Sequence, residues 1–153
     1  MTTLQNLENM VGKELGVSDW VLIDQGLIDT HAATTGEDVW IHTDPERAAQ
    51  EGAFGTTIAQ GSLVISLLSK MFRSIDLREE DIAYILNYGF DRVRIVQPVV
   101  VDTKVRGRFE LKKLENKGHH GVLGYLDVAV EIEDDDIAPA LVAEWLVYFR
   151  LKD

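Results

Sequence analysis

The chain has 153 residues, of which 46% are hydrophobic and 27% are charged, and these values suit a single globular domain with one core. It contains no cysteine and has a formal net charge of −11, which excludes a disulfide framework and thiolate catalysis and disfavours nucleic acid and anionic membranes as partners. The N-terminus has no basic start followed by an apolar run, and no apolar stretch approaches about 18 residues; we therefore expect neither a signal peptide nor a membrane-spanning helix, and predict a cytoplasmic protein.

The first half of the chain is predicted to be helical. A first helix is indicated by apolar residues at helical spacing, namely Leu4, Leu7, Met10 and Val11. Asp24 is a plausible N-cap for a second helix, which is indicated by Leu22, Ile23, Leu27, Ile28 and Ala32 and ends in the turn at residues 34–36. A third, short helix is indicated after Asp44. Asp44 can cap its N-terminus, Pro45 suits its first position, and Gly52 ends it.

Residues 56–72 differ from the helical segments before them. Apolar side chains cover most of the circumference of the predicted helix, and the residues that interrupt them are mostly small and polar, namely Gln60, Ser62, Ser66 and Ser69, with Lys70 near the end. A helix that is apolar nearly all round must be buried on nearly all sides, so a sheet has to enclose it. Serine in a buried helix usually bonds the carbonyl of the preceding turn, and we expect this of these serines.

The second half of the chain supplies that sheet. Apolar and polar residues alternate with a period of two in residues 92–95, 104–112, 122–132 and 141–151, and residues 118–121 form a glycine-flanked turn. Such patterns separated by turns indicate antiparallel strands. The predicted class is therefore α+β, with a long central helix wrapped by an antiparallel β-sheet, which is the hot-dog arrangement. We expect one domain over residues 1–153, with the acidic run at 133–136 in a solvated turn.

The motif-bearing part of the chain lies at residues 34–61. Glu37 is followed after four residues by His42-Thr-Asp-Pro-Glu-Arg-Ala48, and then by Phe54-Gly-Thr-Thr-Ile-Ala-Gln-Gly61. These motifs resemble those of the MaoC-like dehydratase family, which includes the (R)-specific enoyl-CoA hydratases. The similarity covers residues 22–150 and is greatest to the branch that contains nodulation protein N.

The resemblance implies a hydro-lyase that reversibly hydrates a 2-enoyl thioester, such as an enoyl-CoA, to a 3-hydroxyacyl thioester. It implies a carboxylate and a histidine that hold the reacting water, with the backbone N–H of Gly61 as the donor to the thioester oxygen. His42 is the histidine of this dyad, and we expect it outside the packed core. No metal or redox cofactor is implied, and the expected assembly is a homodimer with its sheets joined edge to edge.

Two positions depart from the family pattern. Glu37 occupies the place of an aspartate, and it carries the same group on one more methylene. Asp38 is the alternative acid if the turn is displaced by one residue. Gln60 replaces a histidine, so this position can still donate a hydrogen bond but cannot take a proton at neutral pH. Ser69 is a further pocket candidate by analogy.

A cluster of basic residues stands out on this acidic chain. Eight of the 15 Lys and Arg residues lie between Arg92 and Lys117. The simplest interpretation is that they are solvated faces of strands. In the alternative, one or two of them bind the phosphates of an anionic thioester carrier, and we expect Arg92 and Arg94 to do so.

Two other functions fit the same fold. A hot-dog thioesterase usually has a carboxylate on or beside the central helix, but residues 60–72 contain neither Asp nor Glu. An acyl-thioester-binding protein without hydratase activity is the other alternative, and the departures at Glu37 and Gln60 favour it. Four histidines without cysteine make no zinc pattern.

Overall fold

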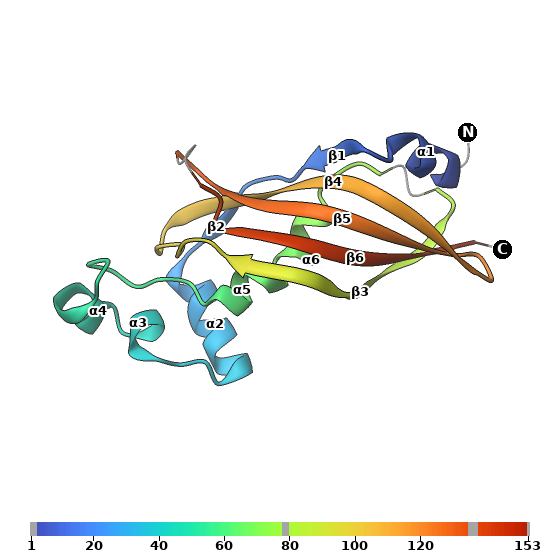
Figure 1. Cartoon of the computed structure of the whole chain (residues 1–153). Coiled ribbons are helices and arrows are strands. Elements are labelled where there is room, and N and C mark those ends of the chain that lie inside the picture. Colours follow the sequence, from blue (N-terminus) through green and yellow to red (C-terminus); the bar gives the residue numbers. More distant parts are fainter. Residues whose placement is uncertain (1–2, 78–79, 135–137, 153) are drawn as a thin grey trace.

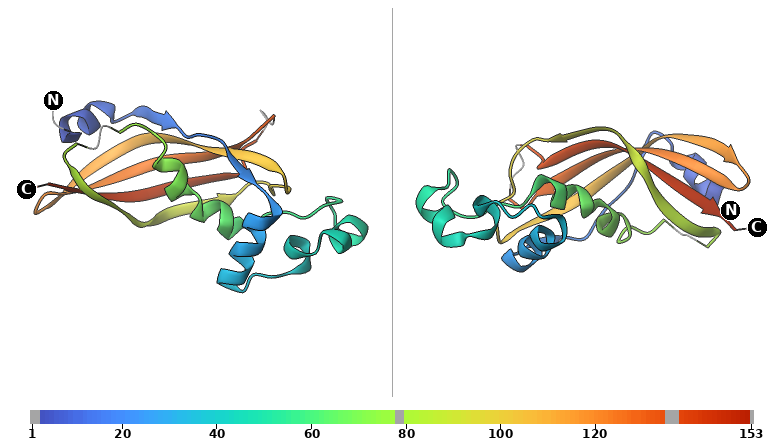
Figure 2. Two further views of the ribbon diagram at one scale, coloured as in Figure 1. Left: turned by 180° about the vertical axis from the view of Figure 1, so that it is seen from behind. Right: turned by 90° about the horizontal axis from the view of Figure 1, so that it is seen from below.

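The computed structural model describes residues 3–77, 80–134 and 138–152. One antiparallel sheet of six strands curves around two short helices, and three further helices project beyond one end of the sheet, opposite the end where both termini lie (Figures 1 and 2). The helices are α1 (Thr3–Met10), α2 (Gln25–Thr35), α3 (Trp40–Thr43), α4 (Pro45–Glu51), α5 (Gly61–Ser66) and α6 (Leu68–Phe72). The strands are β1 (Lys13–Val17), β2 (Val21–Ile23), β3 (Ile82–Ile95), β4 (Thr103–Gly118), β5 (Gly121–Ile132) and β6 (Leu141–Leu151).

The sheet has the order β1-β4-β5-β6-β3, and β2 also pairs with β4. Alternate residues of β4, β5 and β6 form its buried inner face, as the period-two pattern predicts. Phe72 of α6 packs edge-on against Phe109 and Trp145 of this face, with ring centroids 5.1 Å and 5.4 Å away. The predicted α+β arrangement, a helical segment enclosed by an antiparallel sheet, is confirmed.

The central helix is divided, whereas the sequence predicts one continuous helix. Leu67 separates α5 from α6. The Ser66 hydroxyl donates to the carbonyl of Leu63 at 2.8 Å, and the same carbonyl accepts the N–H of Leu67 at 3.1 Å. A hydroxyl that competes for a helical carbonyl in this way bends a helix. The predicted hydrogen bond of a serine to a helical carbonyl is therefore confirmed at Ser66. The expectation that the helix is buried on nearly all sides is wrong, because one face of α5 and α6 carries exposed residues, namely Ser62, Ser66, Ser69 and Lys70.

The three helices predicted in the N-terminal half are present as α1, α2 and α4, but the second begins later than predicted. The carboxylate of Asp24 caps α2 by accepting from the N–H of Leu27 at 2.8 Å, and Asp44 caps α4 in the same way. Gly36, with φ 75°, ends α2. Leu22 and Ile23 were wrongly placed in a helix, because they belong to β2 and pair with β4. A short apolar run has no decisive period, so the neighbouring strand determines its conformation.

Two short elements, β1 and α3, have no counterpart in the sequence prediction. Residues 118–121 form the predicted turn, in which His119 and His120 have φ values of 46° and 60°. Of the acidic run, Glu133 and Asp134 lie in a turn, while residues 135 and 136 lie outside the described residues. No helix among residues 3–77, 80–134 and 138–152 is long and apolar enough to cross a membrane.

Candidate functional site

Glu37 and His42 both form hydrogen bonds with the segment of residues 58–62, which leads into α5. The ring Nδ1 of His42 lies 2.7 Å from the carbonyl oxygen of Ile58. The Ser62 hydroxyl lies 2.5 Å from Oε2 of Glu37, and Nε2 of Gln60 donates to the main-chain oxygen of Glu37 at 3.2 Å. A segment of five residues spans at most about 15 Å, so these contacts hold Glu37 and His42 in one small region.

His42 is held in a defined tautomer. Its partner, the Ile58 carbonyl, can only accept, so Nδ1 carries the proton and Nε2 of the neutral ring is left as an acceptor. The side chain is only 7% exposed, which corrects the expectation that His42 lies outside the packed core. The cause is α3, which turns the ring inward against the 58–62 segment.

A second network fixes the backbone of His42. Nε2 of Gln25 donates to the His42 carbonyl at 2.7 Å, and Oε1 of Gln25 accepts from the hydroxyl of Thr57 at 2.6 Å. Thr57 is fully buried. No sequence pattern predicts Gln25 or Thr57, because their importance depends on contacts between α2, α3 and the segment before α5.

The carboxylate that contacts α5 is that of Glu37. Its Oε2 accepts from Ser62, and the same hydroxyl lies 2.8 Å from Nε2 of His31 on α2. Asp38 is exposed, and its main-chain oxygen accepts from Thr43. This arrangement supports Glu37 over Asp38 as the acid. The expectation that Ser62 bonds a helical carbonyl is wrong, because its hydroxyl points to Glu37. No motif predicts His31.

Gln60 is completely buried and has a fixed orientation. Its Nε2 donates to the carbonyls of Ile28 and Glu37, at 3.3 Å and 3.2 Å. The amide oxygen cannot donate, so the nitrogen must be the atom that faces the two carbonyls. Its Oε1 is buried without a hydrogen-bond partner among the described residues. Gln60 therefore ties α2 to the backbone of Glu37 through its amide nitrogen, and its oxygen remains available for a donor.

The isosteric substitution Gln60→Glu should destabilise the fold strongly. It replaces the nitrogen that donates to two carbonyls with an oxygen that repels them, at a fully buried position. We expect the free energy of unfolding at pH 7 to fall by about 3 kcal/mol or more, as when a buried charge loses its compensation. Urea denaturation measures the loss, and Gln50→Glu on the exposed surface of α4 is the matched control. Equal stability of the two variants would contradict this role.

Gly61 begins α5, and its backbone packs closely against β3. A Cβ added to Gly61 would lie 3.1 Å from Cγ1 of Ile95, so a side chain would require Ile95 to move. The first N–H groups of a helix lack intrahelical partners, and the N–H of Gly61 is the first of α5. Ser69 lies elsewhere: it is exposed and lines a hollow of about 500 Å³ between α6 and β3. The structure does not bring Ser69 to Glu37 and His42.

The basic cluster lies mostly in ion pairs. Six of its eight members pair with carboxylates, namely Lys104, Arg106, Arg108, Lys112, Lys113 and Lys117. Hydrogen bonds from Arg108, and also from Arg106, lower the pKa of Glu131. Arg92 and Arg94 make no ion pair within the described part of the chain. For most of the cluster, the interpretation as solvated strand faces therefore holds.

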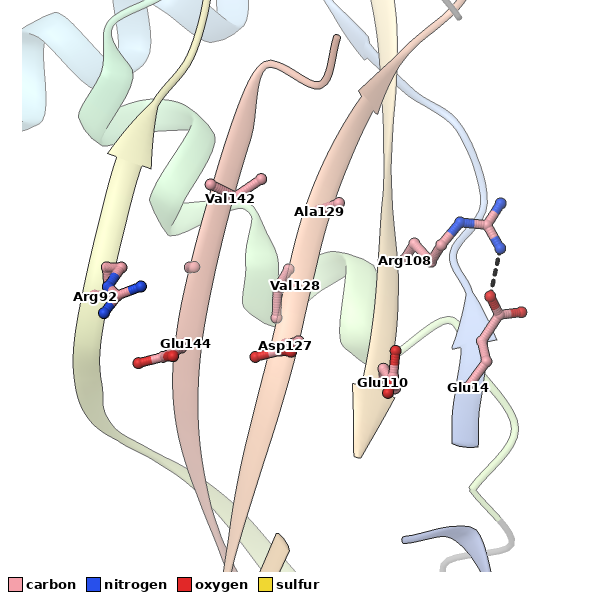
Figure 3. A pocket seen from close by; sticks show the side chains of 10 residues that line it. Glu14, Arg92, Arg108, Glu110, Asp127, Val128, Ala129, Val142 and Glu144 are labelled. Carbon is pink, nitrogen blue, oxygen red and sulfur yellow. Dashed lines mark hydrogen bonds and ion pairs between the residues drawn. The ribbon is translucent and has the colours of Figure 1, made fainter. Parts of the chain in front are cut away.

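Arg92 and Arg94 lie on the outer face of the sheet, opposite the central helix. Arg92 pairs across the strands with Glu144, and Arg94 with Val142. Arg92 lines a hollow of about 410 Å³ together with Glu110, Asp127 and Glu144. Figure 3 shows Arg92 at one side of this group, on β3. Within one chain, these arginines and the Glu37–His42 pair are on different sides of β3. Both groups nonetheless lie near it, because Gly61 packs against Ile95 at the end of that strand.

The chain is similar in sequence to known proteins. The family profile described as "MaoC like domain" matches residues 6–131. The chain belongs to the MaoC-like family. It is 43% identical over 150 residues to "Nodulation protein N" of Rhizobium leguminosarum bv. viciae, covering 97% of this chain and 91% of that protein. It is 37% identical over 147 residues to "3-hydroxyacyl-thioester dehydratase Z" of Mycobacterium tuberculosis H37Rv, covering 96% and 95%.

A solved structure shares the fold. The MaoC-like dehydratase from Rhodospirillum rubrum superposes with a TM-score of 0.76 at 15% sequence identity, covering 96% of this chain and 97% of that one. The hot-dog fold expected from the sequence is confirmed, and so is the resemblance to the nodulation protein N branch of MaoC-like dehydratases.

Proposed function

We propose that this MaoC-like protein reversibly hydrates a 2-enoyl thioester to a 3-hydroxyacyl thioester. The observation that carries the proposal is the attachment of both Glu37 and His42 to residues 58–62 at the start of α5. The relative from Mycobacterium tuberculosis, which is named as a dehydratase of 3-hydroxyacyl thioesters, supports the same reaction class.

The proposed mechanism uses a single water between the two side chains. Nε2 of His42 is an acceptor, and Oε1 of Glu37 remains available because Ser62 bonds Oε2. The water donates one O–H to Nε2 of His42 and the other to Oε1 of Glu37. The proton on the Glu37 side passes to the carboxylate as the water oxygen attacks C3, and the same proton passes from Glu37 to C2 as the enolate collapses, so the dyad ends in its starting protonation state. The N–H of Gly61 would stabilise the negative charge that develops on the thioester oxygen.

The proposed hydration needs neither a metal nor a redox cofactor. Hydration changes no overall oxidation state, and a carboxylate, an imidazole and an amide donor supply the proton transfers and charge stabilisation. In the assay below, addition of a chelator should therefore leave the rate unchanged. Loss of activity on chelation, with recovery on adding one metal, would overturn this part of the proposal.

The test is turnover of crotonyl-CoA by the purified chain. Hydration removes the enone absorbance without releasing thiol, whereas a thioesterase would release free thiol and a binding protein would do neither. We expect loss of absorbance, formation of 3-hydroxybutyryl-CoA and no thiol. Equilibrium binding of crotonyl-CoA without turnover would favour the acyl-thioester-binding protein instead, and thiol release would favour the thioesterase.

Substitution of Arg92 or Arg94 should weaken substrate binding without affecting the chemical step. We propose that Arg92 and Arg94 bind the phosphates of the thioester carrier. Arg92→Glu and Arg94→Glu should each raise the KM for crotonyl-CoA about 5-fold at low salt, with less effect at high salt and an unchanged kcat. Lys13→Glu on β1 makes the same charge change at the opposite edge of the sheet and is the control. An unchanged KM would remove the arginines from the site.

We also propose a homodimer joined at β3. This strand is at one end of the strand order, so one of its edges has no partner within the described residues. Large apolar side chains on it are 48% to 60% exposed, namely Tyr84, Leu86, Tyr88 and Ile95. Light scattering at micromolar concentration should report a dimer, and Tyr88→Lys should shift it toward monomer, while Leu22→Lys at the other edge should not. A monodisperse wild-type monomer would contradict the proposal.

A further inference from the structure

A polar chain joins Glu37 to two residues outside the proposed dyad. His31 of α2 and Ser62 of α5 are separated by 31 residues in the sequence, yet Nε2 of His31 lies 2.8 Å from Oγ of Ser62. The same hydroxyl lies 2.5 Å from Oε2 of Glu37. His31 and Glu37 are both half-buried. Ser62 itself is exposed. Its hydroxyl therefore lies between the ring of His31 and one carboxylate oxygen of Glu37.

The direction of this chain follows from counting protons. The Ser62 hydroxyl has one proton, and a carboxylate can only accept, so Ser62 donates to Glu37. The lone pairs of Ser62 then face His31, whose Nε2 must carry a proton and donate to them. A serine nucleophile activated by His31 would need the opposite direction, with Ser62 giving its proton to the ring. The arrangement therefore serves the carboxylate and does not activate the serine.

We infer that His31 and Ser62 are positioning residues that hold Glu37 in its reactive conformation. This inference rests on the proposed hydration. Glu37 is fixed at both ends, because Gln60 binds its main-chain oxygen and Ser62 binds Oε2. The longer glutamate arm would otherwise sample several rotamers. The contacts from Ser62 and Gln60, with His31 behind Ser62, form a clamp that limits the arm to one rotamer, in which Oε1 remains free for water. A charge-assisted hydrogen bond makes Ser62 a strong partner for this purpose.

Paired variants test the inference by separating positioning from folding. Ser62→Ala and His31→Ala should each lower kcat for crotonyl-CoA about 10-fold, with KM changed less than about 2-fold. Ser62→Thr keeps the hydroxyl, and His31→Gln places an amide donor where Nε2 stands; each should restore most of kcat. The double alanine variant should be no slower than the slower single variant, because the chain is already broken. Unchanged kcat in Ser62→Ala would overturn the inference.

A second readout does not depend on turnover. Imidazole ¹⁵N NMR of the full chain should show that Nε2 of His31 is protonated, and this resonance should shift in Ser62→Ala and in Glu37→Gln. If the wild-type protein fails to hydrate crotonyl-CoA, the proposed function fails, and the NMR result alone decides whether the clamp exists. A His31 ring protonated only at Nδ1, or insensitive to both substitutions, would overturn the inference even in an active enzyme.

Discussion

Removal of either proposed dyad member is expected to abolish hydration of crotonyl-CoA. His42→Ala removes the hydrogen-bond acceptor that orients the water, but it also leaves a cavity, since His42 is 7% exposed. His42→Asn is the sharper variant, because its amide nitrogen can still donate to the Ile58 carbonyl while the acceptor at Nε2 is lost. We expect kcat to fall at least about 100-fold in both variants and in Glu37→Gln, which keeps the shape of the carboxylate but cannot accept a proton.

Asp38→Asn is the internal control for this prediction. Asp38 neighbours Glu37 in the chain, but it is exposed, and the structure gives its main-chain oxygen, not its carboxylate, a hydrogen-bond partner. Its substitution should change kcat less than about 2-fold, on the scale of ordinary surface substitutions. Loss of activity in Asp38→Asn with retention in Glu37→Gln would show that the acid is displaced by one residue. Thermal melting checks that each inactive variant is folded.

The sheet was predictable because strand periodicity decides which face is buried. In β4, β5 and β6 the alternation of apolar and polar residues places side chains such as Phe109, Val128 and Trp145 inside, and the observed register agrees. β1 and β2 were not predictable in this way, since they have only five and three residues. Their conformation comes from pairing with β4, which a local pattern does not encode.

The site was predictable only as far as sequence-local motifs reach. The resemblance to MaoC-like dehydratases implies Glu37, His42 and Gly61, because the motifs that carry the resemblance lie close together in the chain. Local motifs do not predict the supporting residues His31, Gln25 and Thr57, because these residues act through hydrogen bonds between elements that are far apart in sequence. The sequence does not predict whether the extra methylene of Glu37 lowers kcat, because the effect depends on which residue contacts the carboxylate.

The contact with Ser62 decides how Glu37→Asp should behave. If the longer arm were a handicap, aspartate would raise kcat. In this structure Oε2 of the longer glutamate arm lies 2.5 Å from the Ser62 hydroxyl. Removing one methylene withdraws the carboxylate by about 1 Å or more, and a displacement of that size costs on the order of 100-fold in rate. We therefore expect kcat to fall about 10- to 100-fold, less than in Glu37→Gln, because the carboxylate can still accept a proton.

A double-variant comparison makes this prediction specific to the clamp. In wild type, Glu37→Asp breaks the Ser62 contact as well as shortening the arm. In a Ser62→Ala background that contact is already absent, so Glu37→Asp should cost less than it does alone. Steady-state kcat values for the four proteins measure this coupling. A rise of kcat in Glu37→Asp would mean that the extra methylene misplaces the reacting water, and that His31 and Ser62 hold Glu37 in an unproductive position. Additive losses would instead mean that arm length acts independently of Ser62, with the water placed by the backbone around Glu37 and by His42.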